Sequence, residues 1–204
     1  MPELFDHILS DRCYAVRLFA SLLGAKLTRK TVDWAPSRSP ASSGVLPLNP
    51  AGDIPVLVDG DLVLTDITAI LLHLVSAFDL GNAWRANDAE VRRWLDFAAG
   101  PLSSISRARA VTLFSAEGDR EGLMRESRAT MRVVEDHLTD QHVRQQKFVA
   151  SAQPSLADIA IFPAVALSHD AGIGHEDFPA IHLWQRRIRG LPGFISMPGI
   201  PDYF

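Results

Sequence analysis

Apolar positions in the first 77 residues alternate between strand-like and helix-like spacing. Short apolar runs around Leu4-Phe5 and over Leu27 to Val32 predict strands. The segment from Cys13 to Leu23 repeats its apolar residues at the helical period and is followed by Gly24, a common helix stop. A further helix is predicted from Asp66 to Val75. Alternating strands and helices predict an α/β domain with a mostly parallel sheet.

A different pattern, from residue 49 to residue 64, predicts a turn, a proline and a β-hairpin. Residues 49–52 (Asn-Pro-Ala-Gly) mark the turn, and Pro55 stands at the entry to the apolar residues 56–58. Asp59-Gly60 is a tight-turn signal before a second apolar strand at residues 62–64. Proline cannot donate to a sheet ladder, and a plain hairpin needs only the Asp-Gly turn. Pro55 therefore indicates either a rigid loop entry or, as in thioredoxin-like folds, backbone presented to a ligand.

The rest of the chain has a helical pattern throughout. Residues 78–86 lack periodicity and predict a linker, and residues 87–204 predict an all-α domain. Asn87, with Glu90 three residues later, has the spacing of a capping box. Gly100-Pro101 should kink the helix that starts there, because proline removes a backbone donor. Further helices are expected near Glu121 to Leu138, after the capping box Ser155-Leu156-Ala157-Asp158, and from Phe178 to Ile188.

Composition excludes several classes of function. A net charge of −4 gives no basic surface for nucleic acid. No apolar run reaches the roughly 18 residues of a membrane span, and the N-terminus lacks the cationic start of a signal peptide, so a cytoplasmic location is expected. The single cysteine, Cys13, allows no intrachain disulfide. The seven histidines show no metal-binding spacing, so no metal site is expected.

Ser10 and Cys13 lie between the first predicted strand and the first predicted helix. In a thioredoxin-like fold this is the place of the redox Cys-x-x-Cys pair, but a hydroxyl and a thiol cannot form a dithiol. The Ser10 hydroxyl could donate to an anion, assisted by the helix dipole. It could equally be a helix N-cap. Cys13 is expected to be buried packing rather than a nucleophile.

Taken together, these motifs resemble the cytosolic glutathione S-transferase family over essentially the whole chain. A serine stands where other classes use tyrosine, so the bacterial, theta-like branch is the most similar. The resemblance implies a thioredoxin-like N-terminal domain and an all-helical C-terminal domain. The matching landmarks are Ser10-x-x-Cys13-x-x-Val16-Arg17-Leu18, residues 49–57, Asp66-Ile67-Thr68-Ala69-Ile70-Leu71, Ser155-Leu156-Ala157-Asp158 and Leu191-Pro192-Gly193-Phe194.

The resemblance also implies a role for individual residues. Pro55 would be cis, leaving the Ile54 backbone free to pair with the cysteinyl part of glutathione. Ser10 would stabilise the glutathione thiolate, and Asp66 would contact the γ-glutamyl amine. Electrophiles would bind at the start of the helical domain, around Trp94, Phe97, Ser104 and Arg107. From helical spacing alone, Trp94 and Phe97 could equally face the core.

Two positions depart from the family pattern. Ile67 stands where the family has a serine that holds the γ-glutamyl carboxylate, so only its backbone N–H is available. Asp53 reverses the charge of a lysine that theta-like relatives often place there, and the nearest obvious cation is Arg38, in the Ser/Pro-rich loop from Ala35 to Gly44. Losing one charge-assisted contact costs about 1.5–3 kcal/mol, or roughly ten- to a hundredfold in affinity. Glutathione binding is therefore expected to be weak.

The function implied by the resemblance is a detoxifying glutathione S-transferase that conjugates glutathione to small hydrophobic electrophiles, through a stabilised thiolate and as a homodimer. A non-catalytic binding or scaffolding protein is the rival, favoured by Ile67 and Asp53. A glutathione-dependent reductase is disfavoured because Ser10 is not cysteine. The helix expected from Asn87 is apolar on more than one face, which is consistent with packing against a partner subunit.

Overall fold

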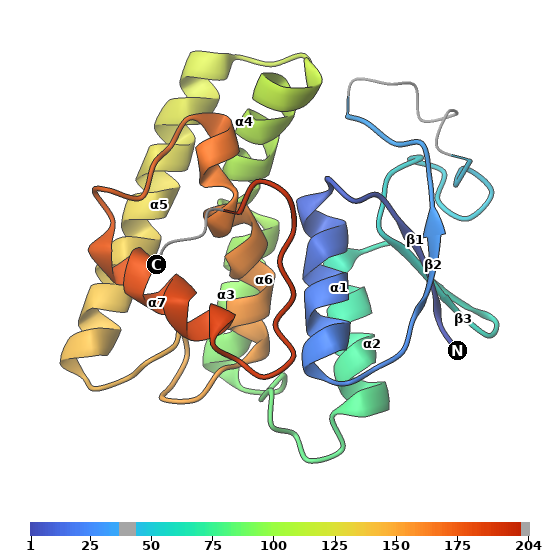
Figure 1. Cartoon of the computed structure of the whole chain (residues 1–204), viewed down its shortest axis with the longest axis horizontal. Helices are drawn as coiled ribbons and strands as arrows, with labels where there is room; N and C mark the ends of the chain where they lie inside the picture. The colour runs from blue at the N-terminus through green and yellow to red at the C-terminus, as the bar shows by residue number, and fades with distance from the viewer. Residues whose placement is uncertain (37–43, 201–204) are drawn as a thin grey trace.

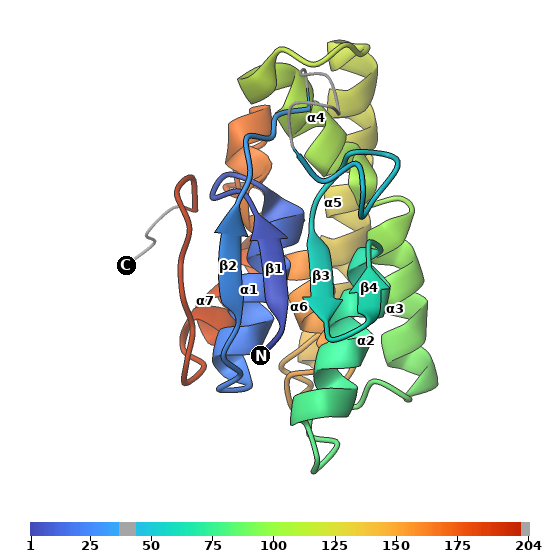
Figure 2. The same cartoon turned by 90° about the vertical axis from the view of Figure 1, so that its right-hand side faces the viewer.

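The computed structural model describes residues 1–36 and 44–200, and in these its strands form one four-stranded sheet with the order β2-β1-β3-β4. The strands are β1 (Glu3–Asp6), β2 (Thr28–Thr31), β3 (Val56–Asp59) and β4 (Leu62–Leu64). They lie side by side in Figure 2, with helices behind them. Strand β1 pairs parallel with β2 and antiparallel with β3, and β3 and β4 form the expected antiparallel hairpin.

The expectation of a mostly parallel sheet is wrong. The pairing of β1 with β2, joined by a helix, is parallel, but β3 runs the other way. A parallel β3 would need a crossover, usually a helix, to carry the chain back across the sheet. The described residues between β2 and β3 contain no such helix.

Two helices, α1 (Asp11–Leu22) and α2 (Ile67–Phe78), cover one face of the sheet (Figure 1). Strand residues alternate between the faces, as the pleat requires. Leu4 and Leu57 are fully buried beneath these helices, whereas Val56 belongs to a second small core on the other side. Strands β1 and β4 run in the same direction, so α1 and α2, which follow them, begin at the same end of the sheet.

The helical domain is built around α6, between α1 and the other helices (Figure 1). The capping box expected from the sequence is confirmed at its start: Asp158 Oδ2 accepts from the backbone N–H of Ser155 at 2.8 Å, and Ser155 caps the helix in return. Asp158 Oδ1 also accepts from Trp184 Nε1 at 2.8 Å. The domain comprises α3 (Ala89–Ala99), α4 (Ser103–Phe114), α5 (Arg120–Val143), α6 (Leu156–Ala166), the short 3₁₀ helix η2 (Ser168–Ala171) and α7 (Pro179–Arg189).

Two details of the first helix in this domain differ from the sequence-based expectation. Helix α3 starts after Asp88, not Asn87, because the Asp88 carboxylate accepts from the Glu90 N–H and pairs with Arg85. Gly100-Pro101 separates α3 from α4 instead of kinking one helix, because Gly100 leaves the helical region with φ −99° and ψ −101°. Pro101, with no N–H, cannot restore the ladder.

The C-terminal segment returns to the first helix. Tyr14 Oη donates to the carbonyl of Ile195 at 2.7 Å, and Ser21 Oγ donates to the carbonyl of Gly193 at 2.7 Å. Gly193 has φ +87°, and a Cβ there would meet the Ser21 carbonyl oxygen at 2.8 Å. Glycine at this position is therefore required by both the conformation and the close approach.

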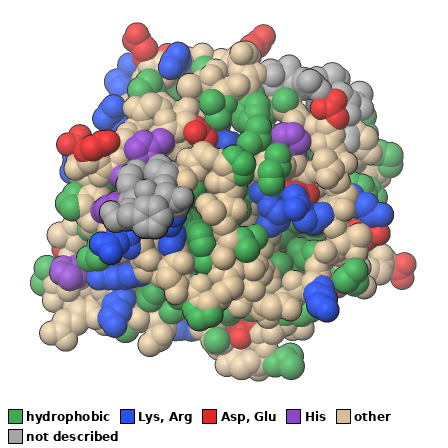
Figure 3. Space-filling model, in the orientation of Figure 1, with side chains coloured by type: hydrophobic (Ala, Val, Ile, Leu, Met, Phe, Trp, Pro, Cys, Tyr) green, Lys and Arg blue, Asp and Glu red, His purple; other side chains and the backbone are tan. Residues whose placement is uncertain are grey.

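Charged and apolar side chains are mixed on the surface. On the face shown in Figure 3, Lys and Arg side chains occur over both domains, interspersed with hydrophobic and acidic ones. None of the helices in the described part of the chain is long and apolar enough to cross a membrane. The described residues also contain no cluster of three or more potential metal ligands.

Candidate functional site

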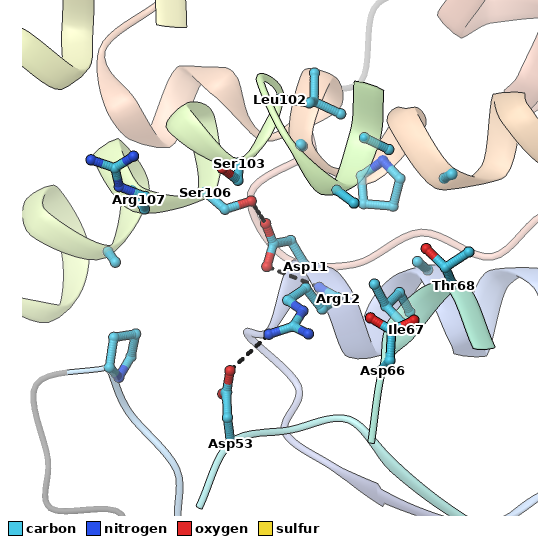
Figure 4. A pocket seen from close by; sticks show the side chains of 18 of the residues that line it. Asp11, Arg12, Asp53, Asp66, Ile67, Thr68, Leu102, Ser103, Ser106 and Arg107 are labelled. Carbon is cyan, nitrogen blue, oxygen red and sulfur yellow. Dashed lines mark hydrogen bonds and ion pairs between the residues drawn. The ribbon is translucent and has the colours of Figure 1, made fainter. Parts of the chain in front are cut away.

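A cavity of about 660 Å³ lies between the two domains (Figure 4). Its volume is within the usual range for small-molecule sites. The wall from the N-terminal domain, called the polar wall, holds the carboxylates of the lining and a guanidinium beside apolar residues. Its charged and polar side chains are those of Asp11, Arg12, Asp53, Asp66 and Thr68, and its apolar ones include Ala15, Trp34 and Ile67. The opposite wall comes from α3, α4, α6 and the connection between α3 and α4, and most of its residues are apolar. The apolar residues are Ala98, Ala99, Leu102, Ala110, Ala160, Pro163 and Ala164, and the polar ones are Ser103, Ser106 and Arg107.

Ser10 caps α1 at the polar wall. Its Oγ accepts from the backbone N–H of Cys13 at 3.2 Å, and the residue is only 1% exposed. This bond uses the oxygen, and among the described residues no acceptor receives the hydroxyl hydrogen. Ser10 itself is not among the described residues that line the cavity, whereas the next two residues, Asp11 and Arg12, are.

The Cys13 thiol lies inside the protein. Cys13 is completely buried, and burial raises the pKa of its thiol to about 12, so it is protonated at neutral pH. The expectation that Cys13 is buried in the packing is confirmed.

A hydrogen bond across the cavity joins the two domains. Ser106 Oγ, on α4, donates to Asp11 Oδ2, and Asp11 Oδ1 accepts from the backbone N–H of Arg12 at 2.9 Å (Figure 4). A carboxylate in the first turn of a helix is favoured by the helix dipole. Sequence reasoning missed both side chains, because they are 95 residues apart.

Two buried arginines fix the loop between β1 and α1. Arg17 donates to the carbonyls of His7 and Ile8 at 3.2 and 3.1 Å. Arg109, on α4, donates to the carbonyl of Leu9 at 2.6 Å. Each domain thus contributes one guanidinium to the backbone that leads into Ser10.

The loop before β3 has the cis peptide bond that the resemblance implies, between Ile54 and Pro55. The Ile54 N–H already has an acceptor, however. The N–H of Ile54 donates to Oδ1 of the preceding Asp53 at 2.9 Å, and Ile54 is 1% exposed. The Asp53 carboxylate also accepts from Arg12 Nη1 at 2.7 Å and from Trp34 Nε1 at 2.9 Å.

The start of α2 forms another part of the polar wall. Asp66 caps the helix, with Oδ1 accepting from the backbone N–H of Ala69 at 2.9 Å. Asp66, Ile67 and Thr68 all line the cavity (Figure 4). Thr68 supplies a hydroxyl one position after Ile67, and sequence reasoning missed it because the family pattern draws attention to position 67.

The residues expected to bind the electrophile do not all reach the cavity. Arg107 lines it, and its 63% exposed side chain places Nη1 4.0 Å from Glu126 Oε2. Trp94, Phe97 and Ser104 lie outside the described lining. Trp94 is 2% exposed because its ring packs on Phe97 and His137, and the buried Ser104 donates to the Pro101 carbonyl at 2.8 Å. Arg38 lies outside the described residues.

Comparison with known proteins gives consistent matches at both domains. Residues 3–76 match the model of the glutathione S-transferase N-terminal domain, and residues 117–187 match that of the C-terminal domain. Human glutathione S-transferase theta-1 is 27% identical over 203 residues, covering 94% of this chain and 83% of that protein.

Solved structures share the fold. A glutathione S-transferase from Xanthobacter autotrophicus has a TM-score of 0.80 at 23% identity, covering 98% of both chains. A glutathione transferase homologue from Lodderomyces elongisporus, determined with two glutathione molecules per subunit, has a TM-score of 0.81 at 21% identity and covers 94% of both chains.

Proposed function

Because this chain belongs to the glutathione S-transferase family, we propose that it conjugates glutathione to hydrophobic electrophiles in a detoxifying reaction in the cytoplasm. The observation that carries the proposal is the two-sided cavity. One wall offers helix N-termini, carboxylates and a guanidinium, which suit a charged peptide, and the other is mostly apolar. A thiol and an electrophile held against these walls would be brought together in one space, and such proximity lowers the barrier of a two-molecule reaction.

In this proposal the reactive group is the glutathione thiolate. Ser10 donates its hydroxyl hydrogen to the sulfur while its oxygen still caps α1. The helix dipole at the start of α1 lowers the thiol pKa further. The thiol proton passes to solvent, the thiolate attacks the electrophilic carbon, a C–S bond forms, and the leaving group departs with its electron pair. The alkyl or aryl group is thereby transferred to sulfur.

The groups of the polar wall would orient glutathione in the cavity. The γ-glutamyl end is assigned to the start of α2, with its amine at Asp66 and its carboxylate at the Ile67 N–H and the Thr68 hydroxyl. The cysteinyl part is assigned to Ile54, beside the cis bond. The electrophile then faces the alanine-rich wall, with Arg107 at its edge.

The test is conjugation of glutathione to a chromogenic aryl halide, followed by absorbance, together with calorimetry of glutathione alone. Ala160→Leu narrows the apolar wall, so the KM for the aryl halide should rise while glutathione affinity is kept. Ala77→Leu, on an exposed position of α2, is the matched control. Glutathione binding without turnover would favour the non-catalytic rival, and absence of both would overturn the proposal.

We also propose that the chain forms a homodimer. The apolar arc of α3 is not the support that the sequence suggested, because Trp94 packs inside its own subunit. Support comes instead from apolar side chains left in solvent on β4 and after α2: Leu62 is 43% exposed, Val63 40% and Leu80 92%. Sedimentation equilibrium should give twice the 22.4 kDa chain mass, and a single species at the monomer mass would reject the dimer.

A further inference from the structure

The carboxylate of Asp53 is bound by donors from three separate segments. Oδ2 accepts from Arg12 Nη1, on α1, at 2.7 Å. Oδ1 accepts from Trp34 Nε1, after β2, at 2.9 Å and from the backbone N–H of Ile54 at 2.9 Å. Arg12, Trp34 and Asp53 all line the cavity, and Figure 4 shows the Arg12–Asp53 pair at its polar side.

The Arg12 guanidinium and the Trp34 indole N–H are groups that bind carboxylates in general. A guanidinium supplies a charge-assisted hydrogen bond, and the indole N–H adds a second, directional donor. The Trp34 ring lies close to His7 and Phe114, with ring centroids 5.9 and 6.0 Å apart. Because those rings restrain it, the indole N–H would stay in place if the carboxylate left.

The ion pair that Asp53 forms here with Arg12 is exposed to solvent. The side chains of Arg12 and Asp53 are 39% and 43% exposed, and ion pairs this exposed add little to stability. Asp53 can therefore turn into water, where its charge is solvated. The N–H of the buried Ile54 would then need another acceptor, and a peptide carbonyl of a ligand would supply one.

We propose that Arg12 and the Trp34 indole form a carboxylate-binding subsite, that Asp53 fills it in the free protein, and that the carboxylate of a thiol peptide displaces Asp53. The inference rests on the proposed function for the identity of that peptide, glutathione. Since the γ-glutamyl end is assigned to α2, the glycyl carboxylate is the one that reaches Arg12. Displacing one side chain frees the guanidinium, the indole N–H and the Ile54 N–H together.

The subsite can be tested without glutathione. Asp53→Ala removes the internal carboxylate, and acetate can then take its place. Of the four tryptophan indole N–H signals in a ¹H–¹⁵N spectrum, that of Trp34 is assigned with Trp34→Phe. In Asp53→Ala, acetate should shift this signal in a saturable way, and chloride at equal ionic strength should not.

Three controls decide this experiment. The wild type, whose subsite is filled, should show no such shift. Asp61→Ala, which removes an exposed carboxylate from the turn between β3 and β4, should behave like the wild type. Adding Arg12→Met to Asp53→Ala should abolish the response. The inference is overturned if acetate leaves the Trp34 signal of Asp53→Ala unmoved, or moves it equally in the wild type.

Displacement by glutathione is tested separately, by calorimetry with Asp53→Asn, which keeps the shape of the side chain. Removing a competing exposed ion pair should tighten glutathione binding by about fivefold. Glutathione with its glycyl carboxylate amidated should gain less, and Asp61→Asn should change neither affinity. Weaker glutathione binding by Asp53→Asn would overturn the displacement and leave the transferase proposal standing. If glutathione binds no variant, the proposed function fails, and the acetate titration still decides the subsite.

Discussion

Replacing Ser10 with alanine removes a helix cap and, in the proposed mechanism, a donor to the thiolate. The cap is visible in the bond from the Cys13 N–H to Ser10 Oγ, 3.2 Å long and buried. Losing a serine N-cap costs about 1 kcal/mol. For a chain of this size, a loss of that magnitude lowers Tm by roughly 2–4 °C.

The contribution of the Ser10 hydroxyl as a donor to the thiolate is separate from its contribution as a cap. A hydrogen bond to a charged acceptor contributes about 1.5–3 kcal/mol, and about 1.4 kcal/mol corresponds to one pKa unit. Without the Ser10 hydroxyl, the pKa of the bound glutathione thiol should therefore rise by about one to two units. Turnover at neutral pH should fall accordingly, while glutathione affinity changes less, because the donor acts mainly on the anion.

Three variants separate the two roles. Ser10→Gly lacks the hydroxyl but costs only a few tenths of a kcal/mol as an N-cap, so it should raise the thiol pKa with a nearly normal Tm. Ser10→Thr retains both functions and should resemble the wild type. The assay is ultraviolet titration of the bound thiolate, with Tm measured on the same samples. Equal thiol pKa values in the wild type, Ser10→Ala and Ser10→Gly would refute the donor role and leave Ser10 as a cap alone.

Ile67→Ser should strengthen glutathione binding in calorimetry, because the new hydroxyl would reach the γ-glutamyl carboxylate; unchanged affinity, or an equal gain in Ile67→Ala, would contradict this. Burial lowers the pKa of His175 to about 4 from 6.5, so the unfolded chain takes up this proton first as the pH falls. The free energy of unfolding should therefore decrease between pH 6.5 and 4, by about 2 kcal/mol at pH 5. His175→Gln should remove that part of the slope in urea titrations, and an identical slope would count against it. Asp158→Ala leaves buried donors such as Trp184 Nε1 unpaired and should cost at least about 3 kcal/mol, whereas Asp140→Ala, on an exposed position of α5, should cost little.

Features fixed by neighbouring residues could be predicted from the sequence. The Asp59-Gly60 turn depends on the positive φ of Gly60, and the N-cap Ser10 and the capping box at Ser155 depend on side chains within three residues of the backbone they bind. The choice between Asn87 and Asp88 could not be made in this way. Both residues are good N-caps, and the pairing of Asp88 with Arg85 decides between them.

Most of the cavity depends on contacts between distant residues. Arg12 and Asp53 are 41 positions apart, and no spacing rule relates them. The family pattern identified Asp53 as a reversed charge but not the arginine that neutralises it. Trp94 shows the opposite failure: its helical position suits either a core or a cleft, and only packing against Phe97 and His137 decides.

The return of the C-terminal segment to α1 affects how the protein can be made. Tyr14 bonds to a carbonyl 181 residues later, and Ser21 to one 172 residues later. A ribosome releases α1 long before it reaches Gly193 and Ile195, so the nascent N-terminal domain emerges with this side of its first helix uncovered. Removing the segment that holds Gly193 and Ile195 would take both of these hydrogen bonds away from α1, whose first turn borders the cavity. Helix α1 is synthesised early, but it gains these two hydrogen bonds only after almost the whole chain has been made.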